Sequence, residues 1–276
     1  MNTKKKLKLG HSLDPDDAFM FYALAKNKIP TEGLQFEHFL ADIETLNQLA
    51  EKSELDITAL SLHAYAYLTD TYALLSSGAS MGEGYGPIVV AKKRYLVPGT
   101  VIAVPGEKTT AFLALKLYLG CDFRYRVVPF DKILREVTSG RAPAGLIIHE
   151  GQLTYEREGL VKIADLGEWW QKKTGLPLPL GVNAAKRSLG KVVLEKISRV
   201  LKTSIDYALK HRRDALEYAQ NFGRGISPET TDKFVSMYVN RYTQDYGKRG
   251  CQALNIFLTE CSEKGLIPKV GKLEFV

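Results

Sequence analysis

Long apolar runs are absent from this 276-residue chain. A helix needs about 20 consecutive apolar residues to cross the hydrocarbon core of a bilayer, and no stretch approaches that length. The start of the chain, residues 1–10, is basic, but no apolar signal-peptide core follows it. The sequence therefore predicts a cytoplasmic protein that does not contact a membrane.

Cysteine is scarce, and histidine is not clustered. The 3 cysteines form no CxxC pair, and none stands among histidines at the spacing of metal ligands. The histidines outside the segment discussed below, His11, His38, His63 and His211, have no ligand-like spacing either. We expect reduced, structural cysteines and no metal site, with His63 in a structural role.

Nucleotide-binding motifs are also missing, and none of the usual hydrolase motif surrounds Ser61. The glycine-rich segment 76–87 precedes a strand-like run, whereas a dinucleotide fingerprint opens a helix. We expect this segment to be a flexible loop that lines a cleft. No GxSxG surrounds Ser61, so the sequence does not mark this serine as a nucleophile. The net charge of +7 comes from scattered lysines without a groove-reading motif, which predicts no nucleic-acid partner. A mildly attractive field for a small anionic ligand is compatible with it.

What the chain does contain is an alternation of strand-like and helix-like runs over its first 180 residues, which indicates an α/β fold. Amphipathic helices follow from Leu189 onward, and we expect them to cover sheet faces. Two extended crossings, near 89–93 and 178–184, divide this pattern. They predict one lobe from residues 1–92 completed by 182–276 and a second lobe from 93–181. A ligand cleft would lie between them, with the crossings as hinges.

One apolar run ends abruptly in a histidine beside a glutamate, at Gly145-Leu146-Ile147-Ile148-His149-Glu150. The run fits a short buried strand, and ligand sites in α/β sheets lie beyond the carboxyl ends of the strands. His149 therefore stands where a reacting group is expected, with a side chain that titrates near physiological pH. A strand-end histidine that only caps a carbonyl is the alternative. Glu150 either tunes His149 or points into solvent.

Two further segments should converge on the cleft. Thr109 and Thr110 precede an apolar helix, where free amides and hydroxyls can hold an anion such as a carboxylate. A plain threonine cap is equally compatible with this sequence. The Leu60-Ser61-Leu62 turn lies at a strand-to-helix junction, and its hydroxyl and amides could donate to a ligand from the opposite wall.

Taken together, these segments resemble the 1,4-dihydroxy-6-naphthoate synthase family of the futalosine route to menaquinone. The resemblance covers nearly the whole chain and is most specific at Gly145–Glu150 (GLIIHE) and at Thr174–Gly181 (TGLPLPLG). Further matching stretches are Asp42–Asn47, Pro105-Gly106 with Thr109-Thr110-Ala111, Asp165–Trp170 and Tyr238-Val239-Asn240.

The resemblance implies a type II periplasmic-binding-protein fold, with mixed sheets flanked by helices and a ligand cleft between two lobes. It implies cleavage of cyclic dehypoxanthinyl futalosine to 1,4-dihydroxy-6-naphthoate and dihydroxyacetone, without a cofactor or metal. The family's catalytic base falls on His149. Its substrate-binding positions fall on Leu60, Ser61 and Leu62 and on Thr109 and Thr110.

One departure concerns the start of the chain, where the family often reads Pro-Asn-Asp-Thr-Phe and this sequence has Asp16 and Ala18 in place of the asparagine and threonine. Polar contacts made there in relatives are therefore in question. Two other functions remain open: a non-catalytic protein of the same fold that binds a small carboxylate, and the sister chorismate dehydratase. The sequence leaves the oligomeric state open.

Overall fold

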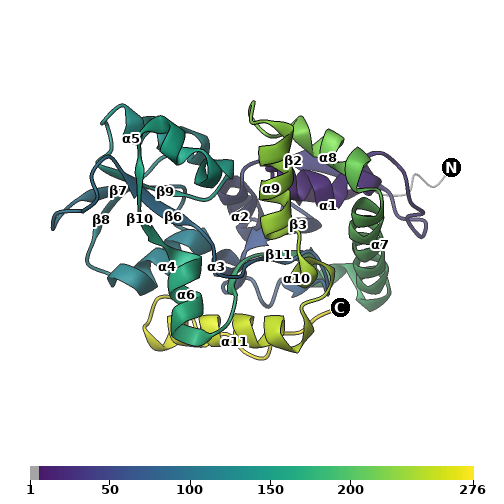
Figure 1. Cartoon of the computed structure of the whole chain (residues 1–276). Coiled ribbons are helices and arrows are strands. Elements are labelled where there is room, and N and C mark those ends of the chain that lie inside the picture. Colours follow the sequence, from purple (N-terminus) through teal and green to yellow (C-terminus); the bar gives the residue numbers. More distant parts are fainter. Residues whose placement is uncertain (1–5) are drawn as a thin grey trace.

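Two mixed β-sheets, each flanked by helices, form two lobes that lie side by side in the computed structural model (Figure 1). The structure describes residues 6–276, so residues 1–5 of the basic start lie outside it. Within the described chain, none of the helices combines the length and apolarity that a membrane crossing requires. The α/β, two-lobed prediction is confirmed.

The first sheet has the strand order β2-β1-β3-β11-β4, with β5 also paired to β11. Its strands are β1 (Leu7–His11), β2 (Phe36–Leu40), β3 (Ile57–Ser61), β4 (Tyr72–Leu74), β5 (Ser80–Gly82) and β11 (Leu178–Lys186). Strand β1 runs parallel to β2 and β3, whereas β11 runs antiparallel to β3. The carboxyl ends of β1 and β3 therefore meet at one edge of this sheet.

The second sheet has the order β10-β6-β9-β7-β8. Its strands are β6 (Ile88–Ala91), β7 (Val101–Val104), β8 (Arg124–Val127), β9 (Ala144–Ile147) and β10 (Val161–Asp165). Strand β9 is buried along its whole length, lies parallel to β7 and ends two residues before His149. Strand β6 already belongs to this sheet, so the first crossing between the sheets lies upstream of Ile88, in the segment after β5.

Helices cover both sheets. Those of the first lobe are α1 (Pro15–Ala25), α2 (Ile43–Glu51), α3 (Leu62–Tyr65), α7 (Lys191–Lys210), α8 (Arg212–Gln220), α9 (Pro228–Tyr238) and α10 (Arg241–Gln244). Those of the second are α4 (Thr110–Leu119), α5 (Ile133–Thr138) and α6 (Leu166–Thr174), with short 3-10 turns η1 (Phe130–Lys132), η2 (Glu150–Leu153) and η3 (Tyr155–Glu158). A further turn, η4 (Arg187–Leu189), precedes α7.

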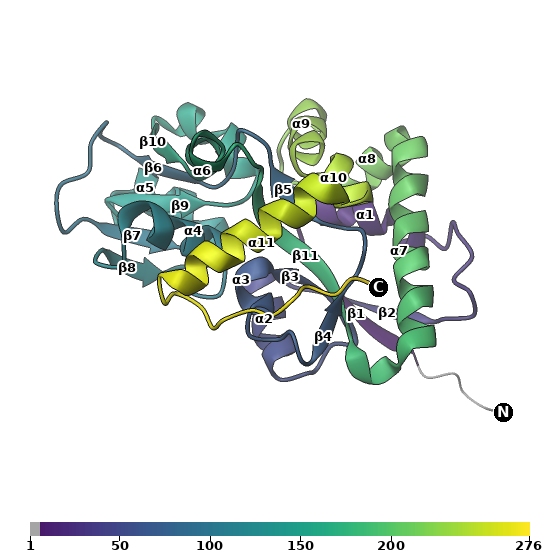
Figure 2. The ribbon, with the colours of Figure 1, turned by 90° about the horizontal axis from the view of Figure 1, so that it is seen from below.

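Helix α11 (Gly247–Glu263) joins the lobes from below, running from α10 to the second lobe (Figure 2). Its buried residues Leu254, Phe257 and Cys261 belong to one apolar core together with Phe112 of α4 and Trp170 of α6. The C-terminal helices thus do more than cover one sheet, because α11 ties the back of both lobes into a continuous core.

The start of α1 carries two local signals for a helix N-terminus. Pro15 occupies the first turn, where its missing N–H is not needed, and Asp16 and Asp17 stand at the positive end of the helix dipole.

The prediction of a loop over the glycine-rich segment 76–87 failed at β5, which forms a short strand inside that segment. Three residues paired to β11 are too few for a period-two pattern to show. All three cysteines are free, but only Cys261 is buried, so the structural role expected for Cys121 is wrong.

Candidate active site between the lobes

A cavity opens between the two sheets, at the place where the carboxyl ends of their strands meet. Ser12 and Asp14 follow β1, Ser61 ends β3, and Ile148 follows β9. The first turn of α4 completes the cavity from the second lobe. The remaining lining residues are Asp16, Asp17, Ile43, Ala59, Leu60, Gly78, Ser80, Pro87, Thr109, Thr110, Ala111, Gln152, Leu180, Gly181, Val182, Asn183, Phe234 and Tyr238.

The start of α4 gives this cavity an electropositive wall. Thr109 caps the helix: its hydroxyl accepts from the Phe112 amide at 3.2 Å and donates to the Gly106 carbonyl at 2.8 Å. The Thr110 hydroxyl donates to the Leu180 carbonyl at 2.6 Å. Both hydroxyl protons are thus occupied, and among the described residues nothing accepts from the amides of Thr110 and Ala111. Those two amides, rather than the hydroxyls, are free to bind an anion.

Ser61 faces the cavity from the other lobe and is held by a residue that sequence analysis did not single out. Asn47 on α2 is fully buried. Its amide oxygen accepts from the Ser61 backbone at 2.9 Å, and its Nδ2 donates to the Ser61 hydroxyl at 3.1 Å. The Ser61 hydroxyl therefore accepts within the protein and keeps its own proton for a ligand.

The predicted binding residues do not all reach the cavity. Leu60, Ser61, Thr109 and Thr110 line it, whereas Leu62 is fully buried in the apolar core behind β3. Leu62 follows Ser61 at the first position of α3, so its side chain leaves the cavity side. Whether the four lining residues bind a ligand stays a prediction.

The opposite wall carries three carboxyl groups at the start of α1. Asp17 accepts from the Ser12 amide at 2.6 Å, and burial raises its pKa to about 6. Asp16 lines the cavity, and burial, followed by the nearby charges of Asp17 and Asp14, raises the pKa of its carboxyl well above the usual range. The cavity is therefore polar at two ends, with amides at one and carboxyl groups at the other.

We predict that Asp16 makes ligand binding depend on pH. As the pH rises through its elevated pKa, Asp16 becomes an anion beside Asp14, and the KM of an anionic substrate should increase because like charges repel. Asp16→Asn cannot ionise, so its KM should stay close to the wild-type value at low pH and rise less than that of wild type as pH rises, since only Asp17 still titrates at this wall. Steady-state kinetics across the pH range measures both. Parallel profiles for the two proteins would contradict the prediction.

His149 lies directly behind the cavity wall formed by its neighbours Ile148 and Gln152. Only 5% of the residue is exposed. Its Nδ1 accepts from the Gly151 amide at 2.9 Å, so the proton is on Nε2, which donates to the Phe130 carbonyl at 3.1 Å. Burial lowers the pKa of His149, which keeps the ring neutral. A neutral imidazole is suited to act as a base, but here its lone pair is held by a backbone amide.

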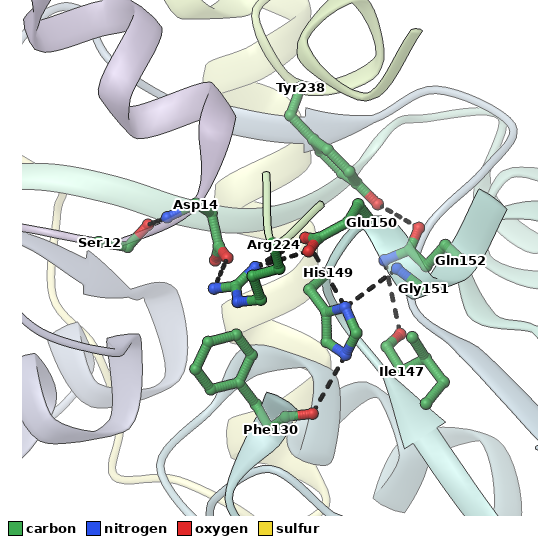
Figure 3. A network of polar contacts seen from close by, with 10 residues as sticks. All are labelled: Ser12, Asp14, Phe130, Ile147, His149, Glu150, Gly151, Gln152, Arg224 and Tyr238. Carbon is green, nitrogen blue, oxygen red and sulfur yellow. Dashed lines mark hydrogen bonds and ion pairs between the residues drawn. The ribbon is translucent and has the colours of Figure 1, made fainter. Parts of the chain in front are cut away.

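Glu150 does not point into solvent. It is buried and forms an ion pair with Arg224, whose Nη1 lies 2.8 Å from both carboxylate oxygens, and it stands 3.7 Å from Nδ1 of His149 (Figure 3). Arg224 also donates to Asp14 at 2.8 Å. Nothing in the local sequence around Arg224, on the turn between α8 and α9, identifies it as part of the site, because it reaches Glu150 only through the fold.

His63 has the structural role expected of it. Its backbone amide donates to the Thr110 hydroxyl at 3.2 Å, and its Nδ1 lies 3.3 Å from the Thr109 carbonyl. On the same side of the cavity, the Glu44 carboxylate accepts from the Lys108 amide at 3.2 Å. These contacts join the lobes next to the start of α4. Within residues 6–276, no group of three or more His, Cys, Asp and Glu side chains is placed to hold a metal ion.

A family model described as menaquinone biosynthesis matches residues 7–263. The chain belongs to this family. Two relatives, each named 1,4-dihydroxy-6-naphthoate synthase, are similar over nearly their full length. The Thermus thermophilus protein is 41% identical over 94% of this chain and 95% of its own, and the Streptomyces coelicolor protein is 35% identical over 96% of both. Because both are named as synthases, this member of the menaquinone-biosynthesis family is an enzyme. The resemblance seen in the sequence is confirmed.

Solved structures agree on the fold. A crystal structure of an Archaeoglobus fulgidus protein is 45% identical and superposes with a TM-score of 0.92, covering 97% of this chain and 100% of its own. The alkanesulfonate-binding protein of Xanthomonas axonopodis pv. citri, bound to MOPS, gives 0.71 at 11% identity, covering 96% of this chain and 94% of that one. This family member therefore has a periplasmic-binding-protein-like fold, as predicted.

Proposed function

We propose that this chain cleaves cyclic dehypoxanthinyl futalosine to 1,4-dihydroxy-6-naphthoate and dihydroxyacetone, as a carbon–carbon lyase without a cofactor. The observation that supports this most is the cavity itself, since it presents unpaired amides to a carboxylate on a chain whose relatives are naphthoate synthases over nearly their full length. The substrate is a small molecule that carries a carboxylate.

In this proposal the carboxylate sits on the amides of Thr110 and Ala111 at the positive end of α4. The Ser61 hydroxyl donates from the facing lobe. Apolar residues such as Leu60, Ile148 and Phe234 surround the ring system and exclude water. The hydroxyl-rich part of the substrate then lies toward the carboxyl groups of Asp16 and Asp17, which can accept or donate hydrogen bonds to it.

His149 acts as the general base. The Nδ1 lone pair must leave the Gly151 amide when the substrate enters, which requires the ring or the η2 backbone to move toward the cavity. The imidazole then takes a proton from the substrate, a carbon–carbon bond breaks, and its electron pair enters the ring that becomes aromatic. Hydrogen bonds at catalytic groups commonly tighten or rearrange only in the substrate complex.

The test is to incubate purified protein with the cyclic compound, without added metal, and to follow both products by chromatography. Release of 1,4-dihydroxy-6-naphthoate and dihydroxyacetone in equal amounts is the expected result. Chorismate, offered in a parallel reaction, should remain unchanged. Turnover of chorismate instead of the cyclic compound would reassign the chain to the dehydratase reaction.

The alternative of a non-catalytic carboxylate-binding protein is not supported, because both relatives are named as synthases. Calorimetric binding of the cyclic compound, with the compound recovered intact after long incubation, would contradict the lyase.

A further inference from the structure

We propose that Arg224 is a positioning residue that reaches from the first lobe to the second and couples closure of the lobes to the placement of the Glu150–His149 pair. The inference rests on the proposed function, because it assigns His149 the role of the base. The inference adds a residue on the turn between α8 and α9. Arg224 does not contact the substrate in this proposal and acts through Glu150.

The geometry of Arg224 is that of a bridge between lobes. One guanidinium nitrogen, Nη1, donates to both oxygens of Glu150 on η2 at 2.8 Å, and the other, Nη2, donates to Asp14 at the start of α1 at 2.8 Å (Figure 3). The guanidinium also lies over the Phe130 ring, with its Cζ 4.6 Å from the ring centre. A planar, five-donor group is suited to hold two carboxylates at once, and a lysine is not.

Both contacts to the second lobe lead to His149. Glu150 is its chain neighbour and stands 3.7 Å from Nδ1. The backbone carbonyl of Phe130, whose ring lies under Arg224, accepts from Nε2 at 3.1 Å. Arg224 thus touches the two residues that flank the imidazole ring, although it belongs to the opposite lobe.

The backbone at Arg224 supports the same conclusion. Its φ of 48° lies in the left-handed region, which L side chains other than asparagine and aspartate rarely adopt. Such a conformation persists only where the surrounding contacts hold it. The ion pairs of Arg224 with Asp14 and Glu150 are among these contacts.

Closure and charge are linked at this bridge. The Glu150 side chain is 4% exposed, so without Arg224 it would be a buried carboxylate with no cation, and separation of the lobes would relieve this by admitting water. The charged groups facing His149 are Glu150 on its own turn, Asp14 from α1 and Arg224 from the C-terminal segment. The two carboxylates raise the pKa of His149 and Arg224 lowers it, while burial lowers it most.

The experiment compares wild type with Arg224→Gln, Arg224→Lys and the matched control Arg199→Gln. Arg199 makes a bidentate pair with Glu32, but both residues belong to the first lobe and are exposed. Small-angle scattering without ligand measures closure, and kcat/KM for the cyclic compound across pH measures placement. We expect R224Q to have a larger radius of gyration, kcat/KM lower by roughly 10²-fold, and an acid limb displaced to higher pH. R224K should fall between R224Q and wild type, and R199Q should match wild type.

The outcomes separate this inference from the proposed function. Inactive wild type would remove the proposed function, whereas scattering would still report on the bridge. Active wild type with R224Q indistinguishable from R199Q in scattering, rate and pH profile would overturn the inference. If R224Q does not fold, R224K answers the same question, because a lysine cannot hold Asp14 and Glu150 at once. Wild-type compactness together with wild-type kcat/KM in R224K would contradict the role of Arg224.

Discussion

His149→Ala is expected to lower kcat for the cyclic compound by roughly 10² to 10⁴, the usual contribution of a positioned general base. KM should change little, because the ring lies behind the cavity wall and the predicted carboxylate seat is on α4. Stopped assays with a long time course measure the residual rate. The loss should exceed that from any side chain that lines the cavity, since Ser61 would contribute only to binding and the Thr110 hydroxyl donates to Leu180.

A matched control is His211→Ala, because His211 stacks on Tyr207 at the end of α7 and does not line the cavity. Its kcat should equal that of wild type. The H149A protein should retain the wild-type circular dichroism spectrum. A folded H149A variant with an unchanged rate would remove the imidazole from the mechanism.

Gly167→Ala is expected to destabilise the protein by about 3 kcal/mol, through steric clash with backbone that cannot move aside. A Cβ at Gly167 would lie 1.9 Å from the Tyr85 carbonyl oxygen and 2.6 Å from the Gly86 nitrogen. This backbone belongs to the first crossing between the sheets and leads to Pro87 at the cavity. Thermal unfolding should show a midpoint lower by roughly 5–10 °C.

The sign of this effect is informative, since alanine is the better helix former and Gly167 lies in α6. Helix propensity alone would predict stabilisation by about 1 kcal/mol. Gly271→Ala is the control, because no atom lies within 4 Å of the added Cβ, and its effect should be under about 0.5 kcal/mol. A G167A protein as stable as G271A would contradict the close packing of the crossing against α6.

The fold was largely predictable from the chain because its signals are local. The proline and aspartates at the start of α1, the buried run of β9 and the threonine cap of α4 each act within a few residues. Short elements failed for the same reason. The three residues of β5 owe their conformation to pairing with β11, almost 100 positions later, and no window of sequence contains both.

The site was less predictable, because its polar contacts join distant segments. Asn47 reaches Ser61 from α2, and Arg224 reaches Glu150 from 74 positions along the chain. The local sequence singled out Thr110 and His149 as candidates, but it could not show that the Thr110 proton goes to Leu180 or that the His149 lone pair goes to Gly151. Those assignments depend on tertiary hydrogen bonds rather than on residue type.

The most direct test of the account is a crystal structure of the protein with 1,4-dihydroxy-6-naphthoate in the cavity. We predict that the carboxylate lies within about 3 Å of the Thr110 and Ala111 amides. The His149 ring should have left the Gly151 amide and turned Nδ1 toward the bound ring system. A ligand seated elsewhere, or a ligand on α4 with His149 still held between Gly151 and Phe130, would contradict the assignment of His149 as the base.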